Sequence, residues 1–184
     1  MKKNILAIFI LFVGVVSAQD KRWYSHAELD VVFPRIDKVT YSYIGGEIKL
    51  DEKLMYGLNY SYNYNIFSKF SVGAVTGFTQ MLNPELTTMK IGGVFRYTFI
   101  KEYQANAFLQ ITGHIPLSNK VAFDLGEVRA GVSMPIARFS NGNSMTLSLY
   151  VLYNSYNIKK PLFTTEVPDI VEYRGTGLSI GYRF

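Results

Sequence analysis

Residues 54–66 read LMYGLNYSYNYNI, and this stretch decides the fold. Its odd-numbered positions are small or polar, apart from Met55. Its even-numbered positions are all large and apolar or aromatic: Leu54, Tyr56, Leu58, Tyr60, Tyr62, Tyr64 and Ile66. Because successive side chains of a strand point to opposite faces, the pattern predicts a β-strand with one apolar and one polar face. A soluble strand usually has about five or six residues and a tilted membrane strand roughly nine to eleven, so the length indicates a transmembrane strand.

The same alternation recurs along the chain. Eight long strands are expected, an even number, with no helix between them: residues 40–50, 54–66, 70–80, 88–100, 103–115, 126–138, 145–157 and 171–184. A sheet survives in a bilayer only when it closes on itself, because every backbone N–H and C=O must be paired within the protein. The sequence therefore predicts an all-β fold, an eight-stranded antiparallel up-and-down transmembrane β-barrel.

The connections between these strands alternate in length. Those near residues 68, 101 and 141 are short, and Asn141-Gly142 is a strong hairpin signal. Those near 84, 120 and 164 are longer. This alternation is typical of outer-membrane barrels, which have short periplasmic turns and long extracellular loops, although the short turn at 51–53 is an exception.

Two segments precede the predicted barrel, which spans residues 40–184. Residues 1–18 read as a secretory signal peptide, with Lys2 and Lys3 before an apolar stretch at 5–16 and a small-residue cleavage site ending at Ala18. Residues 19–39 are interpreted as an N-terminal leader, because Pro34 interrupts a strand-like run. The alternative, that this leader supplies part of the first strand, stays open.

Composition fits one membrane domain. Of the 184 residues, 48% are hydrophobic and 15% aromatic, with 14 Tyr and 13 Phe, which favour strands. Charged residues make up 18% and form no run, which argues against nucleic-acid binding. The absence of Cys excludes a disulfide scaffold, and two isolated histidines do not make an ordinary zinc site.

The interior of an eight-stranded barrel is about wide enough for side chains to fill. The predicted inward positions carry charges that must be paired when buried: Glu47, Lys49, Lys90, Arg96, His114, Glu127, Arg129 and Arg183. Glycines expected to make room for them are Gly57, Gly73, Gly77, Gly131, Gly177 and Gly181. We therefore expect a salt-bridged and hydrogen-bonded plug.

Aromatic residues gather near the strand ends that adjoin the short turns. They are Tyr64, Phe67, Phe70, Phe99, Tyr103, Tyr182 and Phe184. Transmembrane barrels carry such aromatic girdles where the wall meets the membrane interface. The distribution predicts one girdle at the short-turn end.

The chain ends in Gly181-Tyr182-Arg183-Phe184, with a terminal Phe and a Tyr two residues before it. Together with YNYNIFSKFSVGAVTGF at 62–78 and FRYTFI at 95–100, this ending resembles the small eight-stranded outer-membrane β-barrel proteins, particularly those of Bacteroidetes-type bacteria. The resemblance covers residues 40–184. It implies that the barrel-assembly machinery reads the C-terminal strand, although the glycine placement there departs from the usual signal.

One set of residues could be catalytic. His114, Ser118 and Glu127 are of the types that a nucleophilic hydroxyl, its base and an orienting carboxylate require. Lipid A 3-O-deacylases are eight-stranded barrels with a similar set on their outer surface. Here Pro116 intervenes, Ser118 follows His114 by four residues instead of two, and His114 falls on the inward face, so an interior hydrogen-bonded histidine is favoured. His26 is interpreted as a leader residue, not a metal ligand.

These patterns lead to one functional expectation. The protein is expected to be an integral barrel of the bacterial outer membrane with a side-chain-filled interior and a structural or interaction role, and not an enzyme. No catalytic, cofactor-binding or metal-binding residue and no cofactor is assigned. The expected partners are membrane lipid, the barrel-assembly machinery and a further envelope protein, with no nucleic acid. The alternatives are a lipid A acyl hydrolase and a narrow porin-like pore.

Overall fold

The computed structural model describes residues 22–35, 40–43, 46–49, 54–82, 85–100, 104–117, 124–161, 167 and 170–184. The expected signal peptide, residues 1–18, lies outside this part of the chain. The described residues form ten strands: β1 Trp23–Pro34, β2 Thr40–Tyr43, β3 Gly46–Lys49, β4 Met55–Phe67, β5 Phe70–Leu82, β6 Glu85–Ile100, β7 Ala105–Pro116, β8 Asp124–Arg138, β9 Ser144–Asn157 and β10 Ile170–Arg183.

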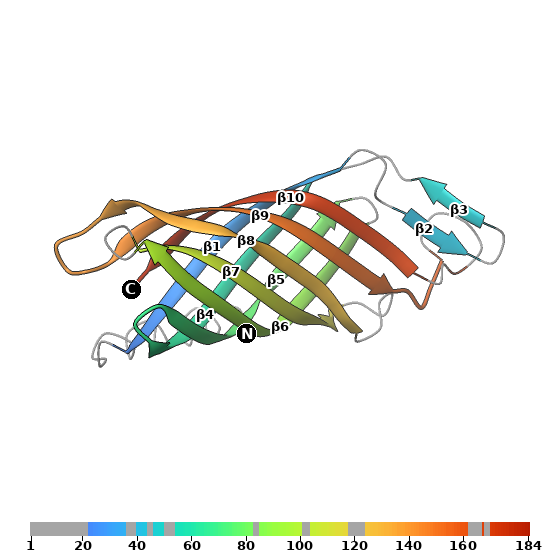
Figure 1. Cartoon of the computed structure of the whole chain (residues 1–184). Helices are drawn as coiled ribbons and strands as arrows, with labels where there is room; N and C mark the ends of the chain where they lie inside the picture. The colour runs from blue at the N-terminus through green and yellow to red at the C-terminus, as the bar shows by residue number, and fades with distance from the viewer. Residues whose placement is uncertain are drawn as a thin grey trace, which may run out of the picture.

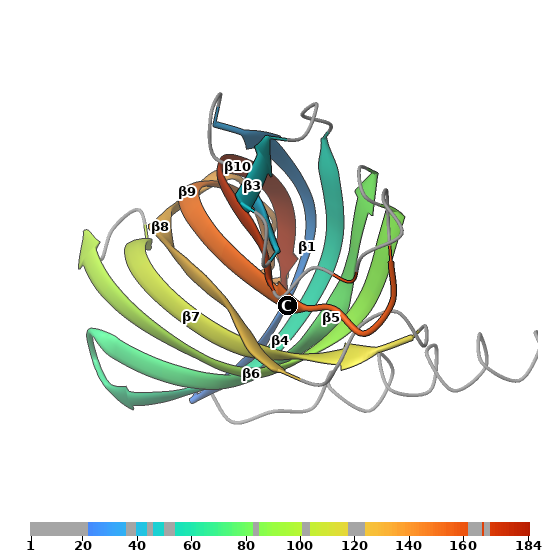
Figure 2. The same cartoon turned by 90° about the vertical axis from the view of Figure 1, so that its right-hand side faces the viewer.

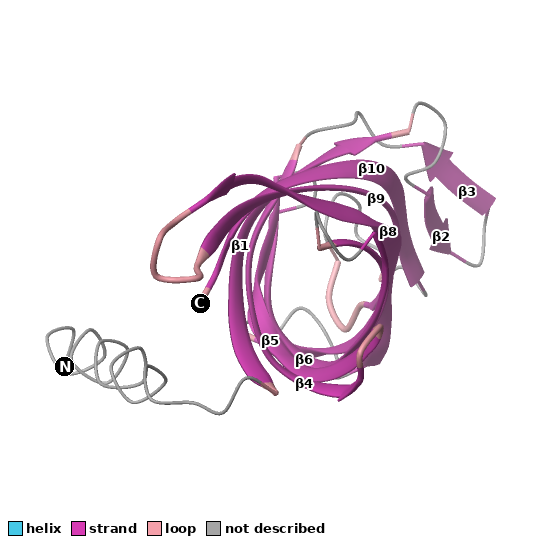
Figure 3. Cartoon of the chain, turned by 60° about the vertical axis from the view of Figure 1, so that its left-hand side comes forward, coloured by secondary structure: helices cyan, strands magenta, loops and turns pink. Residues whose placement is uncertain are grey.

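Eight of these strands, β1 and β4 to β10, close into an antiparallel barrel (Figures 1 and 3). Each pairs with the next in chain order, and β1 pairs with both β4 and β10. At the closure, Glu28 lies opposite Gly181 on one side and Asn59 on the other. The predicted fold class is therefore confirmed.

The identity of the first strand differs from the sequence-based expectation. The sequence pattern predicts a leader over residues 19–39 and a barrel that begins at residue 40, whereas β1 is a full barrel strand. Pro34 is its last residue, where a missing N–H donor disrupts little of the ladder. Strands β2 and β3, at four residues each, are too short to cross a bilayer and form a hairpin beside the start of β10.

This placement also explains the connection lengths. The connection between Pro34 at the end of β1 and Met55 at the start of β4 contains β2 and β3, and the predicted short turn at 51–53 falls in it, outside the described residues. By contrast, β5 and β6 extend as far as Leu82 and Glu85, so the connection between them is tighter than the sequence suggests. The hairpin of β2 and β3 marks the long-loop end, which faces the viewer in Figure 2.

The barrel is polar inside and apolar outside. In β4 the side chains of Asn59, Ser61 and Asn63 are buried, while Tyr56 is exposed, as the alternation predicts. Large apolar side chains cover the outer wall, and the centres of the strands are among the most exposed, with Leu29 66% and Val151 61% exposed. Such an arrangement is unfavourable in water and suits hydrocarbon.

An aromatic belt surrounds the short-turn end. Trp23 stacks on Tyr62 with ring centroids 4.9 Å apart, Phe70 lies 4.9 Å from Tyr97, and Tyr182 lies 5.8 Å from Phe184. The predicted members Phe67, Phe70, Phe99 and Tyr182 are exposed there, and Tyr64 and Phe184 are partly exposed. Tyr103 lies outside the described residues. The belt is the girdle predicted from the sequence.

Candidate functional site

The centre of the barrel is occupied by an ion pair between β1 and β8. Arg129 donates from Nη1 to Oδ2 of Asp30 at 3.1 Å and from Nη2 to Oδ1 at 3.2 Å. The same carboxylate accepts hydrogen bonds from Ser179 at 2.5 Å and from Asn59. The guanidinium carbon of Arg129 lies 3.9 Å from the ring centroid of Tyr150. Four strands are thus joined through one buried carboxylate.

A second ion pair lies on β6 and β8. The Nζ atom of Lys90 is 3.0 Å and 3.2 Å from the two carboxylate oxygens of Glu127, and both side chains are buried. Gln110 on β7 donates to the same carboxylate at 3.5 Å. This pair therefore ties the wall formed by β6, β7 and β8.

A third group gathers around Glu28 on β1. Its carboxylate lies 3.9 Å from both Arg96 and His26 and accepts a hydrogen bond from Ser148 at 3.0 Å. The other ring nitrogen of His26, Nε2, is 2.8 Å from Thr146 Oγ1. His26 is therefore a buried interior residue of the barrel wall, not a leader residue. Polar residues at 26, 28 and 30 alternate with apolar ones, a signal that the interruption at Pro34 obscured.

These three groups form what we call the polar plug: Glu28, Asp30, Lys90, Arg96, Glu127 and Arg129. Three carboxylates meet three cations, so the formal charges of the six residues cancel. Internal voids beside His26 and beside Asp30 are each about 10 Å³, room for about one water molecule. The expected paired, side-chain-filled interior is present at these positions.

Glycines make room for the side chains that surround the plug. A Cβ atom at Gly177 would overlap the ring of Tyr150, and one at Gly181 would lie 2.5 Å from Nε2 of His26. Both glycines make room for interior side chains, although Tyr150 and His26 are not among the charged residues for which that role was predicted. Two residues predicted to carry inward charges, Glu47 and Lys49, belong to β3, which is not one of the eight strands of the ring.

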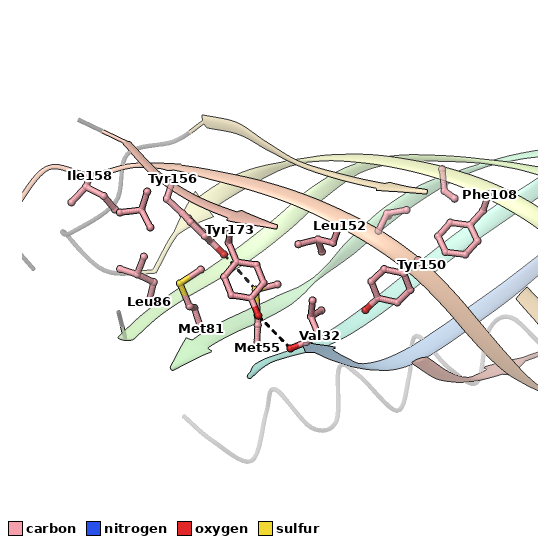
Figure 4. Packing of buried hydrophobic residues seen from close by; sticks show 13 residues of the cluster. Val32, Met55, Met81, Leu86, Phe108, Tyr150, Leu152, Tyr156, Ile158 and Tyr173 are labelled. Atoms are coloured by element: carbon pink, nitrogen blue, oxygen red, sulfur yellow. Dashed lines mark hydrogen bonds between the residues drawn. The ribbon is translucent and has the colours of Figure 1, made fainter. Parts of the chain in front are cut away.

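Toward the long-loop end, the buried interior becomes apolar (Figure 4). The buried side chains there are Val32, Met55, Met81, Leu86, Leu152, Tyr156, Ile158, Val171 and Tyr173, which we call the apolar cap. The hydroxyl of Tyr173 donates to the carbonyl of Val32 at 3.3 Å, and that of Tyr156 lies 3.9 Å from the sulfur of Met55. The sequence patterns did not indicate this second, apolar layer.

Two of the three candidate catalytic residues lie in the interior. His114 is buried and stacks on Tyr156, with centroids 4.7 Å apart and planes 12° apart. Glu127 is bound by Lys90 in the polar plug. Ser118 lies outside the described residues. Neither His114 nor Glu127 is on the outer surface, where the resemblance to deacylases would require them.

Within the part of the chain that the structure describes, no group of three or more His, Cys, Asp or Glu side chains could hold a metal ion.

The same described ranges contain no helix that is long and apolar enough to cross a bilayer.

Comparisons with known proteins give structural neighbours only. No family model and no curated protein matches the chain. It is similar to the crystal structure of Neisserial surface protein A, with a TM-score of 0.46 and 14% identity over 88% of this chain and 95% of that one. It is also similar to a de novo designed transmembrane β-barrel, with a TM-score of 0.45 and 10% identity over 91% and 100% of the two chains. It is similar, too, to the crystal structure of the COG4313 outer membrane channel from Pseudomonas putida F1. That match has a TM-score of 0.32 and 8% identity over 92% of this chain and 97% of that one.

The fold is a transmembrane β-barrel of the outer-membrane type. The closed ring of eight antiparallel strands pairs the backbone groups within the protein, and the apolar outer wall suits contact with lipid.

Proposed function

We propose that this protein is a non-conducting integral barrel of the bacterial outer membrane, of the Bacteroidetes type, with a structural or interaction role in the envelope. The observation that carries the proposal is the polar plug, in which the bidentate contact of Arg129 with Asp30 lies across the middle of the lumen. The apolar cap supports it, because a filled and largely apolar segment opposes the passage of ions. Assembly would use the C-terminal strand, β10, which closes the barrel against β1.

Planar-bilayer conductance tests this proposal. The purified barrel, refolded from inclusion bodies, should add no discrete current steps, whereas a wide porin in the same bilayer gives them. Folding is checked independently by heat-modifiable gel migration. Stepwise conductance from the folded barrel would refute the proposal and favour the narrow-pore alternative.

An absence of lipid A hydrolysis is also part of the proposal. The interior position of His114 and the engagement of Glu127 by Lys90 support it, because lipid acyl chains contact only the outer wall. Expression of the folded barrel should leave the mass of lipid A unchanged. A lower lipid A mass that returns to normal in Ser118→Ala would establish the enzyme instead.

A further inference from the structure

The short-turn end of the barrel holds an open hollow of about 590 Å³, which we call the mouth hollow. Its polar lining residues are Arg22, Asn65, Ser68, Thr98, Gln104 and Arg183. These residues come from β4, β6 and β10 and from the segments that precede β1, β5 and β7, so the hollow lies across the end of the lumen. Ile66 and the girdle residue Phe67 complete its lining, so the hollow lies at the level of the aromatic girdle.

Arg183 differs from the cations of the polar plug. Lys90, Arg96 and Arg129 each have a carboxylate within 4 Å. Among the described residues, no Asp or Glu carboxylate lies that close to Arg183. Arg183 instead contacts an aromatic ring and a neutral amide, which leaves its guanidinium able to bind an anion.

The Arg183 side chain is nevertheless held in place. Its guanidinium carbon lies 3.8 Å from the ring centroid of Tyr24, and the Tyr24 hydroxyl is 2.8 Å from Ser71 Oγ. Nη1 donates to Oε1 of Gln104 at 3.3 Å. Gln104 has a φ of 51°, a left-handed conformation that is uncommon for a residue other than glycine. Two neighbours therefore orient a guanidinium whose other N–H groups can meet a ligand.

We propose that the mouth hollow is a binding site for a water-soluble oxyanion, a phosphate or a carboxylate group, with Arg183 as its principal ligand. The planar guanidinium suits both anions because it donates two parallel N–H groups to two oxygens. Gln104 and Tyr24 act as positioning residues. The proposal does not depend on whether the barrel conducts, and it needs only the folded barrel.

Inorganic phosphate is the first probe. The full mature chain is refolded in micelles of a phosphate-free detergent, and the ³¹P line width of phosphate is followed as protein is added. Phosphate binding should broaden the line, and Arg183→Gln should weaken the affinity by roughly tenfold or more, the effect of losing one charge-assisted contact. Arg183→Lys keeps the positive charge but loses the two parallel N–H groups, so its phosphate affinity should lie between those of the unmodified chain and Arg183→Gln.

Arg174→Gln is the matched control, since it removes the same charge from the same strand at the opposite end, where Arg174 is paired with Glu172. Its affinity should equal that of the unmodified chain. Equal losses in both variants, or no broadening with the unmodified chain, would overturn the proposal. If Arg183→Gln does not fold, Gln104→Ala should still lower the affinity several-fold. Displacement of phosphate by acetate would extend the site to carboxylates, and its failure would restrict the site to phosphate.

Discussion

Asp30 and Arg129 show how a single buried contact can organise this lumen. The two residues are 99 positions apart in the chain, yet their side chains form two parallel hydrogen bonds at full burial. Breaking such a pair leaves one charge uncompensated, which costs more than the intact pair contributes. The plug therefore makes the positions of β1 and β8 depend on one another.

Arg129→Met is expected to lower the free energy of unfolding by about 3–5 kcal/mol, because Asp30 then remains buried without its partner. Asp30→Asn combined with Arg129→Met should recover part of this loss, since both charges are gone. Urea titration followed by the folded and unfolded gel bands measures each value. A double variant that is no more stable than Arg129→Met would contradict the ion-pair account.

Gly177 gives a steric prediction. Gly177→Ala places a methyl group against the ring of Tyr150, which is itself held under Arg129, so the free energy of unfolding should fall by about 1–3 kcal/mol. Gly93→Ala is the control, because its Cβ would meet only the carbonyl of Gly73 at 3.6 Å. Equal stability of the two variants in the same urea titration would show that the ring can move aside.

At the scale of elements, β1 is the strand that closes the barrel. Its outer face should lie in hydrocarbon, with Leu29 near the middle of the strand and 66% exposed. A charge there should be far more costly than one near a strand end, because the cost depends on depth in the bilayer.

Leu29→Arg should therefore lower the free energy of unfolding in lipid vesicles by about 2–4 kcal/mol. Ile170→Arg, at the first residue of β10, should lower it by only about 0–1 kcal/mol. Denaturant titration of both variants in the same vesicles provides the comparison. If the two substitutions cost the same, Leu29 is not at the depth that the strand arrangement assigns.

Considered as a whole, the molecule is asymmetric along its axis. The turns at 68–69 and 139–143, together with the first residue of β1 and the last of β10, lie at one end, beside the mouth hollow and the girdle (Figure 1). The β2 and β3 hairpin and the apolar cap lie at the other. Outer-membrane barrels place their short turns in the periplasm, so the mouth hollow is expected to face that side.

Cysteine labelling tests this orientation, and the chain has no native Cys. Lys160→Cys, on the long-loop side, should react with a membrane-impermeant maleimide in intact cells. Asn141→Cys, in a short turn, should react only after the outer membrane is permeabilised. Both positions are exposed on the protein, so a difference in labelling reports only whether the maleimide can reach that side of the outer membrane. Labelling of residue 141 in intact cells would invert the orientation.

The sequence by itself determined the character of the wall. Alternation with period two and strand length are local properties, and they were sufficient to predict which side chains of β4 face inward, the apolar outer face and the aromatic girdle. They also predicted that charges such as Lys90, Glu127 and Arg129 lie inside.

Only the tertiary structure decided which segment completes the ring and which charges meet. Closure depends on pairing between β1 and β10, about 150 residues apart, and the alternation in residues 40–50, which include β2 and β3, is similar to that of a barrel strand. The contacts of Asp30 with Arg129 and of Arg183 with Gln104 depend on register around the whole ring, because a shift of one residue turns each side chain to the other face.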